Sequence, residues 1–187
     1  MPTVEDKKKL ADDLKAALIA AASESWLLTM NRLIEQGGYD AGIIESMQEQ
    51  AQAEIEGWAG SYAVELVSNL DKNAEGFVRD ALNDYIGTGK PMQELVDKLA
   101  ERFGPVHGAM IAQTEVTAAV AQGALVAMAV NGVGSAAWMT MADERLCEDC
   151  MSNESAGAVP VGGTFPSGHD APPAHVNCRC WLQPAFE

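Results

Sequence analysis

Apolar residues recur at three- and four-residue steps through the first 104 positions, which is the spacing of amphipathic helices. Residues 3–36 carry one long stripe; Thr3 and Asp6 resemble a capping box at its start, and Gly37 and Gly38 end it. Further helices are expected over residues 43–70, 77–86 and 91–103. The pattern therefore predicts an array of helices in this half of the chain.

Residues 105–131 form a further helix, in which alanine, valine and methionine dominate. Its most apolar part, Val116 to Val130, is shorter than the roughly 20 residues that a membrane-spanning helix needs. We therefore expect a buried helix whose small side chains let neighbouring helices approach closely. Glu115 is the one acid in this run, and we expect its carboxylate either to bond to the C-terminal unit or to face solvent.

Short extended segments follow the glycines that end this helix. Residues 135–141, centred on Trp138, and residues 179–183 both have the composition of strands. The fold class predicted is mainly α with a small α+β C-terminal unit: a helical body, residues 1–104, and a unit of residues 105–187 that contains a short β-hairpin-like, Cys/His-stapled module.

All four cysteines and two of the three histidines lie in the last quarter of the sequence. Cys147 and Cys150 form a C-x-x-C pair, a turn that commonly holds a tetrahedral zinc ion through two sulfur atoms. His175, Cys178 and Cys180 form H-x-x-C-x-C, and any two of them could complete a four-ligand shell. These five residues are the candidate ligands of a structural zinc ion.

Two other interpretations of the cysteines stay open. Four cysteines could form two disulfides, although no secretory signal precedes them and reducing compartments disfavour the bond. They could also be free thiols packed as small apolar side chains. Pairing of the strands at residues 135–141 and 179–183 would bring Cys147 and Cys150 close to Cys178 and Cys180, whichever of the three interpretations holds.

The order of the motifs resembles a known family. Thr114 and Glu115 lie in an alanine-rich helix, D-x-R-x-C-x-x-C ends at Cys150, and P-P-x-H-x-x-C-R-C ends at Cys180. Over residues 105–183 the chain resembles the phage Mu F-like minor head proteins, also called the phage head morphogenesis family. The resemblance implies a minor structural component of a tailed-phage head, located in the virion and without enzymatic activity. It further implies that the protein associates with the portal or major capsid protein during head assembly, and that it could also act in DNA packaging or ejection.

Charge limits the choice of partner. The formal net charge is −15, from 27 acidic and 12 basic side chains, so phosphate backbones are repelled and direct binding of nucleic acid is not expected. The acidic and basic residues before Leu14 also exclude a signal peptide, and we expect synthesis in the host cytoplasm and no membrane association. Oligomers are expected only as part of an assembly.

Enzyme classes that use similar residues lack essential parts here. A zinc deaminase needs H-x-E, but Ala109, Ala171 and Asn177 stand two residues after the histidines, and no H-E-x-x-H of a metalloprotease occurs. A thiol oxidoreductase would place its C-x-x-C at a helix start in a βαβ unit, and the neighbouring acids Glu148 and Asp149 should raise the thiol pKa. The alternative function is a zinc-ribbon-like interaction adaptor of a mobile element.

The first helix suggests how a partner would bind. A helix over residues 3–36 is about 50 Å long, which exceeds the width of a small domain. We therefore expect part of its apolar stripe to lack cover within the chain and to bind the portal or capsid shell.

Overall fold

The computed structural model describes residues 4–69, 77–78, 80–82, 84–85 and 91–186. Its long helices are α1 (Val4–Gly37), α2 (Ile43–Asn69), α4 (Met92–Phe103) and α5 (Pro105–Val130), and the described residues between 77 and 85 are helical too. These helices lie where the apolar periodicity predicts them. The capping box predicted at Thr3 and the predicted end of the third helix at residue 86 lie outside the described residues.

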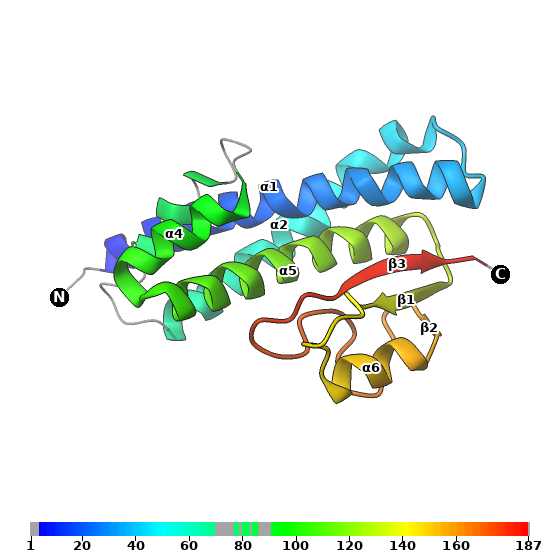
Figure 1. The fold of residues 1–187 in the computed structure, drawn as a ribbon. Helices are drawn as coiled ribbons and strands as arrows, with labels where there is room; N and C mark the ends of the chain where they lie inside the picture. Colours follow the sequence, from blue (N-terminus) through cyan, green and yellow to red (C-terminus); the bar gives the residue numbers. More distant parts are fainter. Residues whose placement is uncertain (1–3, 70–76, 79, 83, 86–90, 187) are drawn as a thin grey trace.

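Helix α5 is the element on which the others pack. It contacts α1, α2 and α4, and Figure 1 shows it between α1 and the small sheet. A side chain at Gly123 would overlap the carbonyl oxygen of Ala22 in α1, so the two backbones meet directly at this point. The small residues of α5 therefore permit the close approach that the sequence predicts.

Most of the described apolar stripe of α1 is covered within the chain, while Leu27, at 47% exposure, is a part of it that lacks cover. Leu14, Trp26, Met30 and Leu33 are buried, because α2 and α5 both pack along α1. Helix length alone overestimates the exposed part, because it does not show how far the neighbouring helices extend.

The C-terminal part of the chain forms a three-stranded antiparallel sheet in the order β2-β1-β3. Its strands are β1 (Ser135–Met139), β2 (Ala158–Pro160) and β3 (Trp181–Ala185). The pairing of β1 with β3 agrees with the sequence prediction, although β3 starts two residues later than expected. Strand β2 was not predicted, because three residues that include a proline carry too little pattern.

Trp138 of β1 anchors the sheet on the helical body. Its side chain is fully buried and meets the Phe165 ring edge-on at a centroid distance of 5.2 Å. The same apolar cluster contains Leu182 of β3 and Met128 of α5. The observed architecture is thus mainly helical with a small β-containing C-terminal unit, as the sequence predicts.

Gly104 lies between α4 and α5, at the boundary predicted between residues 1–104 and 105–187. Helix α5 belongs to the second segment but packs along α1 and α4 of the first. The division into two domains therefore stays a prediction. Among the described helices, none combines the length and the apolar character needed to cross a membrane.

Candidate metal centre

The C-x-x-C pair lies at the start of α6 (Glu148–Ser155), a helix that the sequence did not predict. Cys147 is the N-cap residue, and its sulfur accepts a hydrogen bond from the backbone N–H of Cys150 at 3.4 Å. The helix was missed because it has no apolar stripe: only Cys150 and Asn153 are buried. The expected turn is therefore a capped helix start, although the antiparallel strands around it do not make a βαβ unit.

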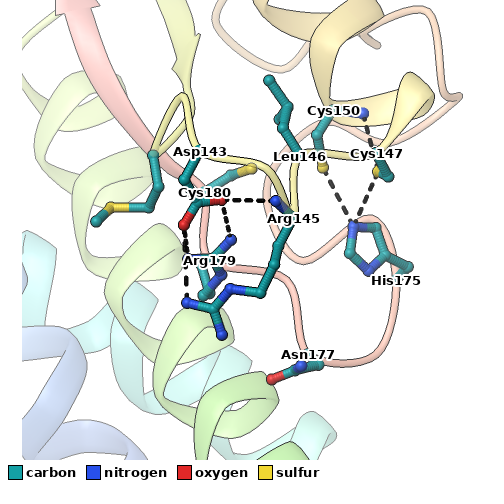
Figure 2. A pocket seen from close by; sticks show the side chains of 10 residues that line it. Asp143, Arg145, Leu146, Cys147, Cys150, His175, Asn177, Arg179 and Cys180 are labelled. Atoms are coloured by element: carbon teal, nitrogen blue, oxygen red, sulfur yellow. Dashed lines mark hydrogen bonds and ion pairs between the residues drawn. The ribbon is translucent and has the colours of Figure 1, made fainter.

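His175 meets both cysteines of this pair. Its Nε2 atom lies 3.2 Å from the sulfur of Cys147 and 3.2 Å from the sulfur of Cys150, as Figure 2 shows. The sulfur of Cys178 lies 3.9 Å from the sulfur of Cys150. The structure thus brings residues of the C-x-x-C pair close to residues of the H-x-x-C-x-C motif.

These distances fit a tetrahedral ion. With zinc–sulfur bonds of about 2.3 Å and zinc–nitrogen bonds of about 2.05 Å, sulfur–sulfur edges are about 3.8 Å and sulfur–nitrogen edges about 3.6 Å. The two sulfur–nitrogen separations of 3.2 Å and the Cys150–Cys178 separation of 3.9 Å lie within about 0.4 Å of these values, whereas Cys178 groups with Cys150 and Cys180 and not with Cys147 and His175. The cavity bounded by Cys147, Cys150 and His175 is about 20 Å³, which is room for one water-sized sphere and too little for an organic ligand.

The orientation of His175 favours metal binding through Nε2. Its Nδ1 atom lies 2.9 Å from the carbonyl oxygen of Val176, which can only accept, so Nδ1 carries the proton in this contact. The Nε2 lone pair is then left to face the sulfur atoms. A fixed tautomer of this kind is usual for histidines that bind a metal.

Cys180 forms a second group with Cys150 and Cys178, in which all three sulfurs lie within 4.8 Å of one another. The Cys180 side chain hydrogen-bonds to Cys178, which lowers the pKa of Cys178 and raises that of Cys180. The five predicted ligands therefore form two overlapping groups that share Cys150: Cys147, Cys150 and His175, and the three buried cysteines.

The thiols differ in their readiness to ionise. Burial raises the pKa of Cys150. Burial also acts to raise the pKa of Cys147, but the Cys150 hydrogen bonds and His175 outweigh it, and the net shift is downward. The raised pKa that we expected at this pair from the neighbouring acids is therefore wrong for Cys147. All four cysteines lie in the described part of the chain, and none forms a disulfide.

A bidentate ion pair joins the two segments that carry the ligands. Both Arg179 guanidinium nitrogens that face Asp143 lie 2.6 Å from its carboxylate oxygens. The Arg179 hydrogen bonds hold the pKa of Asp143 well below its usual range. Because Arg179 lies between Cys178 and Cys180 in the sequence, this contact fixes that segment beside the start of α6 (Figure 2).

Helix α5 also holds the segment around Cys178 in place. The buried Thr117 hydroxyl donates a hydrogen bond to the backbone carbonyl of Cys178 at 2.8 Å. The Thr114 hydroxyl accepts one from the backbone N–H of Asn177 at 2.8 Å. The two threonines of the helix thus hold the ligand-bearing segment before β3 on the helical body, a role that the sequence did not reveal.

Glu115 points elsewhere, and the expected contact with the C-terminal unit or with solvent is wrong. Its side chain is buried and hydrogen-bonds to Tyr62 of α2, while among the described residues its Oε2 atom has no hydrogen-bond partner. Burial raises the pKa of this carboxyl to about 7. Glu115 faces another helix because it lies on the opposite side of α5 from Thr117.

Two further side chains of α6 that the sequence analysis missed join this helix to other parts of the module. The fully buried Asn153 in α6 donates to the Ser167 hydroxyl at 2.8 Å and accepts from the Ser167 backbone N–H at 2.9 Å. Glu154 accepts two hydrogen bonds from Thr140, one from its backbone and one from its hydroxyl. Side-chain bonds between sequence positions 14 apart leave no periodic signal.

Comparison with known families decides the relationship of this chain. The family model described as phage Mu protein F-like protein matches residues 77–183. The chain belongs to this family. The match contains α4, α5 and the whole metal-ligand cluster, and it begins before the region of resemblance that the motifs define, residues 105–183. No curated protein and no solved structure matches this Mu F-like chain.

Proposed function

We propose that the Mu F-like module binds one structural zinc ion through Cys147, Cys150, His175 and Cys178. When bound, the ion would supply a crosslink between the start of α6 and the segment that enters β3. Three sulfurs and one imidazole nitrogen are a common donor set for closed zinc sites. Arg179, held by Asp143, and Thr117 already position the cysteine segment, so little conformational entropy would be lost when the site closes around an ion.

Cys180 is the alternative donor in this proposal. Cys178 and Cys180 both lie within 4.8 Å of Cys150, and the Cys150–Cys178 sulfur separation of 3.9 Å matches a tetrahedral sulfur–sulfur edge of about 3.8 Å. We therefore assign Cys180 to the surroundings of the shell, where its thiol can hydrogen-bond to the Cys178 sulfur. Such outer contacts tune and orient metal ligands.

We further propose that this protein is a minor structural component of a tailed-phage head, present in the virion and associated with the portal or major capsid protein. The observation that carries the proposal is the family match over residues 77–183. The match covers the supporting helices as well as the cysteine motif, so it does not rest on the cysteine spacing alone. The small size of the cavity beside the ligands supports a structural role over a catalytic one.

The acidic character of the chain fits this setting. With a net charge of −15, the protein can lie beside packaged DNA without binding it tightly. Contact with a head protein would then depend on packed surfaces of the helical body. Because α1 and α5 pack along their length, the intact chain and not a fragment is the form to test.

Purified phage heads provide the test. Heads are separated on a density gradient, washed at high salt and analysed by mass spectrometry, and we expect peptides of this chain in a fixed ratio to the portal protein. A phage-encoded DNA-replication protein serves as the control that should be absent. If the chain is missing from heads at every stage of assembly, the proposal is wrong. Recovery only in a complex with host regulators would instead support an adaptor of a mobile element.

A further inference from the structure

A groove lies where α1, α5 and β3 meet. Its volume is about 150 Å³, and an apolar cavity of this size can take a benzene ring. Leu28, Val120, Trp181 and Leu182 line it, and Leu28 is 66% exposed. A large aliphatic side chain of a rigid helix thus faces solvent beside a hollow of side-chain size.

The walls of the groove are already fixed. The Ser25 hydroxyl donates to the Val120 carbonyl at 2.6 Å, which joins α1 to α5 and satisfies one of the few polar groups of the lining. At Gly123 the backbones of the two helices are in direct contact. Figure 1 shows β3 running beside α5, and Thr117 ties α5 to the segment before β3. A preformed groove of this kind loses little conformational entropy when a ligand enters.

One charge borders the groove, and it is positive. Arg32 lines the groove, and its guanidinium hydrogen-bonds to the neutral side-chain oxygen of Gln183 at 3.4 Å. Among the residues that the structure describes, no carboxylate pairs with Arg32. The chain has 27 acidic side chains, yet Arg32 bonds to the neutral Gln183. Its positive charge, beside exposed apolar residues, is therefore complementary to an acidic side chain of another molecule.

We propose that this groove binds a segment of a head protein that inserts one leucine- or phenylalanine-sized side chain and places an aspartate or glutamate beside Arg32. The apolar side chain would cover Leu28, Val120 and Trp181. The acid would form a charge-assisted hydrogen bond with the guanidinium. This inference rests on the proposed function for the origin of the partner, but the chemistry of the segment follows from the groove alone.

Leu27 provides a matched control. It is the neighbour of Leu28 in α1 and is also exposed, at 47%, but it does not line the groove. A photo-crosslinking amino acid at position 28 of the full chain should join it to the portal or major capsid protein of the same phage, when all three are co-expressed. The same residue at position 27 should give several-fold less product. Equal yields at the two positions would overturn the proposal, as would a product that links two copies of this chain.

The crosslinked peptide tests the chemistry. Tandem mass spectrometry should place the link within a few residues of an aspartate or glutamate in the partner, and a segment without an acid would contradict the proposal. With the purified partner, Leu28→Asp and Arg32→Glu should each weaken binding about tenfold or more, while Leu27→Asp changes it little. Arg32→Lys should restore part of the affinity, because it retains the positive charge. Circular dichroism checks that each variant is folded.

The two levels of the inference can fail separately. If heads contain the chain but position 28 gives no crosslink to any head protein, the groove proposal is wrong and the proposed function stands. If heads lack the chain, the proposed function is wrong.

Discussion

Asp143 and Arg179 face each other across 36 positions of sequence and form two hydrogen bonds of 2.6 Å. This pair joins the loop before α6 to the segment between two cysteines, so it closes the ligand cluster independently of any ion. Arg145 adds a weaker contact, with 3.7 Å between its guanidinium and the same carboxylate. The ion pair therefore holds the candidate ligands together without an ion.

Replacing Asp143 by Asn should speed the loss of metal from the folded protein. The neutral amide cannot accept both charge-assisted hydrogen bonds of Arg179, so the cysteine segment moves more freely. We expect a several-fold faster transfer of zinc to a coloured chelator, on the scale of outer-shell mutations at metal sites. Glu144→Gln, a change at the neighbouring exposed acid, is the control. Equal transfer rates in the two variants would show that the ion pair does not act on the site.

Zinc content should distinguish the ligands. Elemental analysis should find about one zinc per chain in protein purified without chelator, and Cys178→Ser should lose most of it. Cys180→Ser should retain it, because the Cys180 thiol lies outside the proposed shell. Loss of zinc in both variants would place Cys180 among the ligands. Zinc-free wild-type protein with four free thiols after denaturation would refute the metal site.

Removing the ion should loosen the module but leave the helices intact. Few apolar residues between Gly157 and Ala174 are buried, so this passage depends on the cluster and on Asn153 for its order. With chelator we expect early proteolytic cleavage there and nearly unchanged helical circular dichroism. A Glu24→Gln variant treated in the same way serves as a reference for nonspecific effects. Cleavage at an unchanged rate would show that no ion holds the passage.

The stability of the helical body should fall as the pH rises from about 4.5 to about 7. Burial raises the pKa of Glu115 from 4.5 to about 7 in the folded state, so the folded chain keeps a proton that the unfolded chain has already lost. The stabilisation is complete below pH 4.5 and is lost as the pH rises through the folded pKa. The shift corresponds to at most about 3 kcal/mol.

Glu115→Gln isolates this effect. The amide resembles the protonated acid, so the variant should be more stable than the parent at pH 8 and similar to it at pH 4.5. Urea unfolding at both values measures the difference, and Glu24→Gln on the exposed face of α1 is the control. A parent and variant that differ equally at both pH values would contradict the titration of Glu115.

Gly123→Ala should destabilise the protein by about 1–3 kcal/mol, because the added methyl group would overlap the Ala22 carbonyl oxygen and push α1 from α5. Gly57→Ala in α2 is the matched control. Its added carbon would meet no described atom within 4 Å, and alanine favours a helix by up to about 1 kcal/mol. We expect opposite changes in the midpoint of thermal unfolding. A Gly123 variant as stable as the parent would show that the helices separate at little cost.

The helices and the main strand pair could be predicted because each leaves a local pattern. The apolar steps through α1 and the proline at the start of α5 mark helix positions, and Trp138 marks a buried strand. The cysteine and histidine spacing placed the five candidate ligands near one another, as the structure shows. These features depend on neighbouring residues along the chain.

Other features depend on contacts between distant residues. Helix α6 has no apolar stripe, and the hydrogen bonds of Thr117 and Arg179 to distant partners follow no sequence period. The cover over α1 depends on where α2 and α5 lie in space. For this reason the sequence located the ligand cluster but not its supports, and it overestimated how much of the α1 stripe is exposed.

The cluster has one more donor than a tetrahedral ion requires, which affects how the site can change by mutation. A substitution at Cys180 leaves three sulfurs and the His175 nitrogen in the sequence, so this position can vary while the crosslink persists. By contrast, Cys150 belongs to both donor groups, and its loss would disrupt both at once. Tolerance of sequence change should therefore be unequal across the four cysteines, with Cys150 the most constrained.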